Sequence, residues 1–130
     1  MSIMGARLGL AARKIVGVHG RDGDVTAVFA NRNCGLDGIQ AALGTTMGNG
    51  NLKVDPRGAN SLEAANDEKG LRVSVTLTEY AQELGKRYGE LRRSGGGEIE
   101  REEILERLRT APDEEVVILE KLPPEIRCCR

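Results

Sequence analysis

The sequence contains almost no aromatic side chains. Tryptophan is absent, and the 130 residues include one phenylalanine and two tyrosines. Proteins usually hold single-stranded nucleic acid by stacking its bases on aromatic rings. The 19 basic and 20 acidic residues also leave no positive excess to neutralise phosphates. Nucleic-acid binding is therefore disfavoured. With so few large side chains, the core must be built from small aliphatic residues, and we expect the chain to gain stability from a partner subunit.

Cysteine and histidine are scarce as well, with three and one in the chain. Two of the cysteines, Cys128 and Cys129, are adjacent near the end, so they do not form the framework of a disulfide-rich secreted protein. His19 is the single histidine, which excludes a metal site with two histidines within one chain. We expect it to be an exposed loop residue in "VHGRDGD".

Long apolar runs are also missing, and none approaches the length that spans a bilayer. The first residues lack a signal-peptide pattern, because Arg7 and Arg13 interrupt their apolar stretch. We therefore expect a cytoplasmic protein without a membrane span.

The chain length fits one domain, which we expect over residues 1–122 with a C-terminal helical extension, followed by a tail at 123–130. Hydrophobic periodicity and turn residues predict the elements in order. They are helix 2–17, strand 25–30, helix 36–43, strand 52–54, a hairpin of 59–66 and 71–77, helices 79–93 and 98–111, and strand 114–122. This order predicts an α+β fold with a mixed, mainly antiparallel sheet covered by helices. The apolar stripe of helix 79–93 should face the sheet.

The stretch "NCGLDGIQAALGTTMGNGNLKV" concentrates candidate site residues. Cys34 and Asp37 lie three apart where a strand turns into a helix, so both side chains can point to the same side of the helix start. Backbone N–H groups there lower the pKa of a thiol and favour a thiolate or a metal-bound sulfur. The alternative is a buried structural cysteine, with Asp37 merely favouring the first helical turn.

The loop "GTTMGNGN" that follows offers a second candidate, because consecutive N–H groups in Gly-rich loops can cradle an anion. It is neither a P-loop nor a dinucleotide fingerprint, since it leads into a strand rather than a helix N-terminus. A plain loop with left-handed glycines remains the alternative.

As a whole, this stretch resembles the FmdE family of formylmethanofuran dehydrogenase proteins, whose motif is Arg-Cys-x-x-Asp-x-Ile-Gln followed by Gly-Cys-Thr-x-Gly-Lys-Gly-Asn-Leu. The matching residues are Cys34, Asp37, Ile39, Gln40, Gly44, Thr46, Gly48, Gly50, Asn51 and Leu52. "MGARLGLAA" looks like the first helix of the family, and the likeness extends to about Leu122.

The resemblance implies an α-β-α-β-β-β core, commonly paired as a homodimer, with a metal-binding cleft usually described with zinc. It also implies association with the redox enzyme of methanogenesis that reduces carbon dioxide onto methanofuran, a one-carbon reaction. In this sequence Thr45 stands where the second cysteine of the motif is expected. Family members usually carry a His-x-Cys-Pro-like segment before the first helix, and this chain starts at or after that point. Zinc takes about four ligands, or three and a water, of which Cys34 and Asp37 supply two.

The first functional hypothesis is a family member whose cleft holds zinc. Cys34 would act as thiolate ligand or nucleophile, and Asp37 as ligand or proton acceptor. Thr45 and Thr46 would donate hydrogen bonds to a bound group, and the remaining cleft residues would be Gln40, Gly48, Asn49, Gly50 and Asn51. A second hypothesis is a non-catalytic accessory or dimerisation subunit that docks on a redox enzyme. A third is a binder of small anionic ligands that uses the Gly44–Asn51 loop. The sequence does not establish an enzymatic activity.

Overall fold

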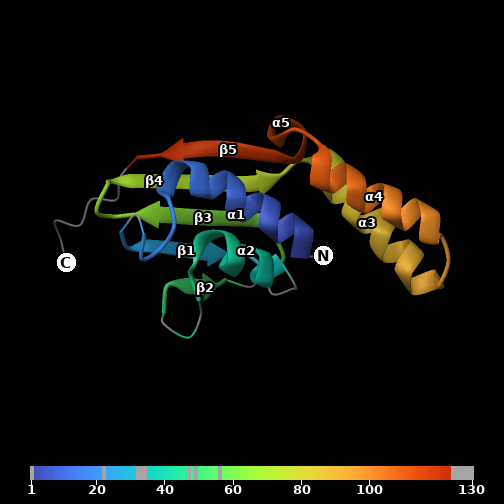
Figure 1. The fold of residues 1–130 in the computed structure, drawn as a ribbon, viewed down its shortest axis with the longest axis horizontal. Helices are drawn as coiled ribbons and strands as arrows, with labels where there is room; N and C mark the ends of the chain where they lie inside the picture. The colour runs from blue at the N-terminus through green and yellow to red at the C-terminus, as the bar shows by residue number, and fades with distance from the viewer. Residues whose placement is uncertain are drawn as a thin grey trace.

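The computed structural model describes residues 2–21, 23–31, 35–46, 48, 50–55 and 57–123. Its elements follow the predicted order (Figure 1). They are α1 (Ser2–Val16), β1 (Val25–Phe29), α2 (Gly35–Leu43), β2 (Leu52–Val54), β3 (Ser61–Asn66), β4 (Leu71–Leu77), α3 (Glu79–Ser94), α4 (Glu98–Thr110), α5 (Asp113–Val116) and β5 (Val117–Leu122). Most boundaries agree with the sequence analysis to within a residue or two.

The short helix α5 is a difference from the sequence prediction, which placed a strand over the whole of residues 114–122. Pro112 precedes it, and its first turn carries Asp113, Glu114 and Glu115. Carboxylates at a helix N-terminus complement the exposed N–H groups there, so this acidic run forms a helical turn before the strand begins.

The five strands form one sheet in the order β2-β1-β3-β4-β5. β1 pairs with β2 in parallel, and the other neighbours pair antiparallel. Along β1, Val25, Ala27 and Phe29 are buried while Thr26 is exposed, which is the alternation expected when one sheet face packs on the core. The predicted α+β class with a mixed, mainly antiparallel sheet is confirmed.

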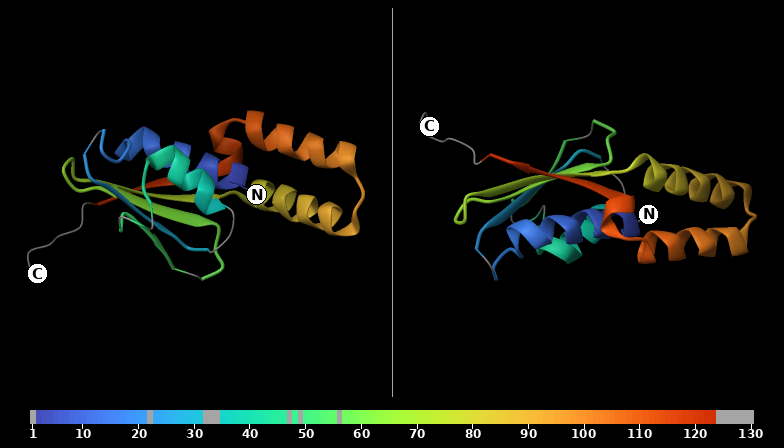
Figure 2. Two further views of the ribbon diagram at one scale, coloured as in Figure 1. Left: turned by 60° about the horizontal axis from the view of Figure 1, so that its bottom comes forward. Right: turned by 90° about the horizontal axis from the view of Figure 1, so that it is seen from above.

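Helices α1 and α2 lie together on one side of the sheet (Figure 2). Leu8, Ala12 and Val16 of α1 are buried in the core beneath them. The two helices approach closely because glycine faces glycine at their crossing. A Cβ built on Gly5 would lie 1.9 Å from the carbonyl oxygen of Gly35. Residues larger than glycine at this position would push the helices apart.

Helices α3 and α4 form a hairpin that extends beyond the end of the sheet (Figures 1 and 2). The prediction that the stripe of α3 faces the sheet is wrong: Leu84 lines a groove shared with Ile104 of α4, and Tyr80 is exposed. The reason is local. Thr78 ends the β4 segment and caps α3 at once, its side chain accepting a hydrogen bond from the Ala81 N–H. With no loop to reverse the chain, α3 runs onward from the sheet and α4 covers its stripe.

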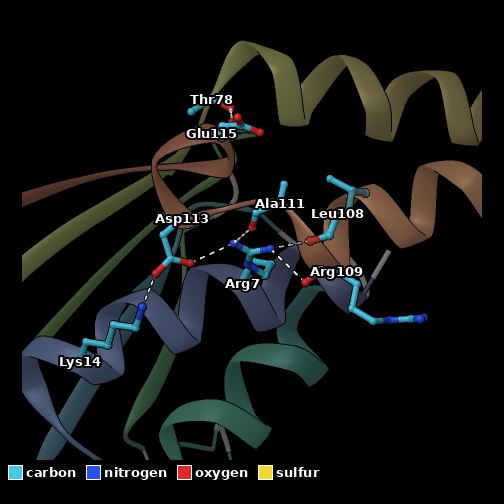
Figure 3. Close-up of polar contacts among 8 residues, drawn as sticks. All are labelled: Arg7, Lys14, Thr78, Leu108, Arg109, Ala111, Asp113 and Glu115. Atoms are coloured by element: carbon cyan, nitrogen blue, oxygen red, sulfur yellow. Dashed lines mark hydrogen bonds and ion pairs between the residues drawn. The ribbon is translucent and has the colours of Figure 1, made fainter.

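Arg7 of α1 ties this hairpin back to the core (Figure 3). Its guanidinium donates to the carbonyl oxygens of Leu108 at 2.7 Å, Arg109 at 3.3 Å and Ala111 at 2.6 Å, where α4 ends. It also donates to the Asp113 carboxylate at 2.9 Å. Carbonyls at a helix C-terminus lack partners within the helix and carry partial negative charge, so a cation satisfies them well.

Across the ranges described above, no helix combines the length and the apolar character needed to cross a membrane.

Candidate functional site

The candidate site lies where α2 begins and where the loop after it returns to the sheet. Asp37 is in the first turn of α2 and is exposed, and Gln40, one turn later, is half-buried. Cys34 lies outside the described residues, so its predicted proximity to Asp37 stays a prediction. Asn49, Cys128 and Cys129 also lie outside them.

The loop from Gly44 to Asn51 closes on itself. Gly44 ends α2 in the predicted left-handed conformation, with φ of 73° and its N–H donating to the Gln40 carbonyl at 2.9 Å. The carbonyl of Thr46 accepts from the N–H groups of Asn51 at 3.1 Å and Leu52 at 3.0 Å. These N–H groups are therefore engaged within the chain, and an anion would have to use others. Gly48 and Gly50 are exposed.

Asn51 anchors the end of this loop to the sheet. Its carbonyl accepts from the Ala27 N–H of β1 at 2.9 Å, directly before the parallel β1–β2 pairing begins. The loop therefore enters β2 with its geometry set by β1.

Thr45, the second residue of this loop, is buried in the protein interior. It is 0% exposed, and its Oγ1 has no hydrogen-bond partner among the described residues. A buried hydroxyl without a partner costs about 1–3 kcal/mol. The neighbouring Thr46 is half-buried. The predicted donor at position 45 therefore faces the protein interior rather than solvent.

His19 is the site residue that the sequence analysis missed, because it was expected to be an exposed loop residue. It is half-buried, and its backbone N–H donates to the Leu43 carbonyl at the end of α2, at 2.8 Å. Its ring Nδ1 accepts from the Val25 N–H at 3.2 Å, and its Nε2 lies 2.9 Å from the side-chain amide of Asn51. The imidazole thus connects the turn after α1, the start of β1 and the Gly-rich loop.

These contacts define the tautomer of His19. Because a backbone N–H can only donate, Nδ1 must be the unprotonated acceptor in neutral His19. Nε2 then carries the proton and donates, which requires the Asn51 amide, placed with its Nδ2 at 2.9 Å, to turn by 180° so that its Oδ1 accepts. The amide oxygen and nitrogen of asparagine are assigned from such networks.

The described residues do not fit a complete zinc site. Within them, no three side chains of the types His, Cys, Asp or Glu come close enough together to hold a metal ion. His19 uses one ring nitrogen for the Val25 N–H and the other for Asn51. A zinc site requires three or four protein ligands. Thr45 is buried at the position of the expected second cysteine and offers only a hydroxyl.

Sequence reasoning had no local signal for the contact between His19 and Asn51, because they lie 32 positions apart. The resemblance named Asn51 but not His19. Only the burial of the turn after α1 against the end of α2 brings the two side chains together.

Comparison with known proteins agrees with this fold. A structure described as a tungsten formylmethanofuran dehydrogenase FmdE-like protein from Syntrophus aciditrophicus superimposes with a TM-score of 0.65 at 21% sequence identity. The match covers 95% of this chain and 64% of that one, so this chain spans slightly less than two thirds of its relative, and at this identity the likeness establishes the fold. No curated protein matches. Residues 1–118 match the family model FmdE, described as molybdenum formylmethanofuran dehydrogenase operon, and the chain belongs to the FmdE family.

Proposed function

We propose that this FmdE-family chain is an accessory subunit that acts by assembly, with itself and with a redox enzyme of the formylmethanofuran dehydrogenase type. The observation that carries the proposal is the composition of the candidate cleft. Among the described residues, buried Thr45 has no hydrogen-bond partner at the position of an expected cysteine, and no three metal-binding side chains gather. The cleft thus supports a structural role better than a catalytic one.

The sheet supports the same role. Helices α1 and α2 lie on one side of it (Figure 2), and Val28 and Ala65 on the opposite face are only half-buried. A shallow groove of about 130 Å³ runs over this face beside the ion pair of Glu63 and Arg72. This mixture of small apolar and polar side chains suits contact with another protein. We place such an assembly in the cytoplasm.

Zinc binding is the second candidate function, favoured by the family to which the chain belongs. Cys34 and Asp37 would then hold the ion, with further ligands from water or from a second subunit. Zinc bound there would act as a Lewis acid. Asp37, exposed at the start of α2, is accessible for this role.

Two measurements on the full chain separate these functions. Elemental analysis should find the same low zinc content in the wild type and in Cys34→Ala. About one zinc per chain in the wild type that disappears in Cys34→Ala would establish the metal site instead. Asp37→Asn provides the matched variant at the second ligand.

Sedimentation tests the assembly role directly. We expect the purified chain to sediment as a dimer, and to bind a purified formylmethanofuran dehydrogenase catalytic complex. A chain that remains monomeric and does not bind that complex would contradict the proposal.

A further inference from the structure

Among the residues that the structure describes, strand β5 is a free edge of the sheet, because the order β2-β1-β3-β4-β5 gives it one neighbour. Ile118 and Leu119 on this strand are 59% and 38% exposed. Few large hydrophobic side chains are exposed in the described part of the chain, and these two are adjacent in sequence. An edge strand with exposed apolar residues is a template for pairing with another strand.

The hydrogen-bond pattern identifies which backbone groups face this edge. The Thr78 N–H donates to the Val116 carbonyl, one step beyond the pairing of Leu77 with Val117. Hydrogen-bonded and non-hydrogen-bonded pairs alternate in antiparallel ladders. The even-numbered residues of β5 therefore bond to β4, and the odd-numbered residues point their N–H and C=O groups outward. The pairing on the other side of β4 supports this assignment. The N–H of Leu77 donates to the carbonyl of Asn60, directly before β3, so Leu77 points its backbone groups away from β5.

The outward-pointing residues are thus Val117, Leu119 and Lys121. The N–H of Val117 is already bonded to the Asp113 carbonyl, where α5 ends. Leu119 and Lys121 contribute both of their backbone groups to the edge, and Val117 contributes its carbonyl.

We propose that a second copy of this chain pairs along this edge, β5 against β5 in antiparallel orientation, with the two-fold axis at Leu119. Leu119 then exchanges hydrogen bonds with its own copy. The Lys121 N–H of each chain donates to the Val117 carbonyl of the other. This inference rests on the proposed assembly role and specifies its interface.

The charges on β5 exclude two neighbouring registers, and a third, centred on Ile118, would place Lys121 opposite residue 115, which belongs to α5 rather than to the strand. Centring the axis on Glu120 would place Glu120 opposite its copy, and centring it on Lys121 would do the same with two ammonium groups. Like charges directly opposite are destabilising. Centring on Lys121 would also bring in Pro123, which has no N–H to donate. With the axis at Leu119, Leu119 faces leucine and Ile118 faces Glu120, so no like charges meet.

The surface beside the edge is complementary to a second copy. A groove of about 290 Å³ lies between Ala11 and Lys14 of α1, the acidic start of α5, and Leu119. In the proposed register the partner's Leu119 side chain enters on this side of the sheet. The partner's Lys121 lies opposite Val117, next to the exposed Glu114 that lines the same groove. By symmetry the charge pair of Glu114 with Lys121 forms twice.

Disulfide trapping tests the register in the full chain with Cys34, Cys128 and Cys129 changed to serine. Residues in a hydrogen-bonded antiparallel pair have Cα atoms about 5.5 Å apart, within the range that a disulfide spans. Leu119→Cys should therefore give an oxidised covalent dimer. Glu120→Cys, whose two copies lie out of register, should not. Cross-linking through Glu120→Cys but not Leu119→Cys would overturn the proposed register.

Variants that keep the native cysteines give an independent test by sedimentation equilibrium. Leu119→Pro removes an outward N–H that the β4 ladder does not use, so it should yield a folded monomer with unchanged circular dichroism. Leu119→Val, the matched control, should remain dimeric.

Glu114→Lys should raise the dimer dissociation constant about tenfold, and adding Lys121→Glu should restore it. A dimer that survives Leu119→Pro and resists trapping would overturn this interface while leaving the accessory role standing. A monomeric wild-type chain would overturn the interface itself.

Discussion

The guanidinium of Arg7 and the carboxylate of Asp113 meet at 2.9 Å across 106 positions of the sequence (Figure 3). The side chain of Arg7 is 11% exposed, and it also holds three backbone carbonyls where α4 ends. One largely buried cation therefore fixes both the end of the helical hairpin and the start of α5.

We expect Arg7→Met to lower the free energy of unfolding by roughly 2–3 kcal/mol, because hydrogen bonds to charged groups contribute about 1.5–3 kcal/mol and the contacts with the Leu108 and Ala111 carbonyls are partly buried. Urea unfolding followed by circular dichroism measures this. The control is Lys14→Met at the other, more exposed partner of Asp113, which should cost less than about 1 kcal/mol. Equal losses in the two variants would contradict the special role of Arg7.

The same cluster predicts sensitivity to acid. The hydrogen bond from Lys14 lowers the pKa of Asp113 below its ordinary value of 3.8; burial opposes this shift, and the hydrogen bond from Arg7 reinforces it. The unfolded chain therefore takes up the proton first as the pH falls. The stabilisation is complete above about pH 5 and is lost from pH 4 downward, through the lowered pKa of the folded state. Asp113→Asn should remove this component, so that the stability difference from wild type shrinks on acidification. A constant difference from pH 7 to pH 3 would contradict it.

A single substitution at Thr45 should raise the free energy of unfolding. Thr45→Val keeps the shape of the side chain and removes the buried hydroxyl, which has no partner among the described residues, so we expect a gain of about 1–2 kcal/mol. Thr45→Ser keeps the hydroxyl and loses a methyl group, and should cost about 1 kcal/mol. Thermal and urea unfolding of both variants give the comparison. Destabilisation by valine would mean that the hydroxyl has a partner in solution.

The close packing of α1 on α2 predicts opposite effects of two Gly→Ala changes. Gly5→Ala should destabilise by about 1–3 kcal/mol, because its Cβ would meet the backbone of Gly35 and the helices would have to separate. Gly89→Ala in α3 meets only the flexible end of Arg93, at 3.5 Å. It should therefore stabilise by about 0.5–1 kcal/mol through helix propensity. A gain from both changes would show that the helices are not in contact at Gly5.

The tautomer of His19 is directly measurable, because the chain has one histidine. Long-range proton–nitrogen correlation spectra above pH 8 should show the proton on Nε2, with Nδ1 unprotonated. Asn51→Ala should leave the tautomer unchanged, since the Val25 N–H alone requires Nδ1 to accept. A proton on Nδ1 would show that the contact with Val25 is absent in solution.

The sequence patterns predicted most of the fold because the decisive signals are local. The alternation in "LRVSVTL" and the glycine after α2 each act within a few residues, and β4 and the Gly44 cap form as expected. The stripe of α3 is equally clear in the sequence, but its partner depends on where the chain leaves the sheet. That exit is set by the cap at Thr78, so the pattern alone favoured the wrong neighbour.

The candidate site was less predictable because its contacts are distant in sequence. The family motif located Asp37, Gln40 and the loop, whereas the role of His19 depends on packing between the turn after α1 and the end of α2. In the sequence, Arg7 stands out only as an interruption of an apolar stretch. Its acceptors are backbone carbonyls more than 100 positions away, which no side-chain pattern encodes.

The shortness of β2 limits how far an assembly built on this sheet can grow. The edge opposite β5 is the three-residue strand Leu52–Val54, which is too short to offer a useful ladder to another chain. A sheet with two long edges can add copies without end and form fibres, whereas a sheet with one long edge forms a closed pair once that edge is occupied. In the proposed dimer, the unequal lengths of the outer strands would leave no second long edge, so pairing through β5 would not continue into a filament.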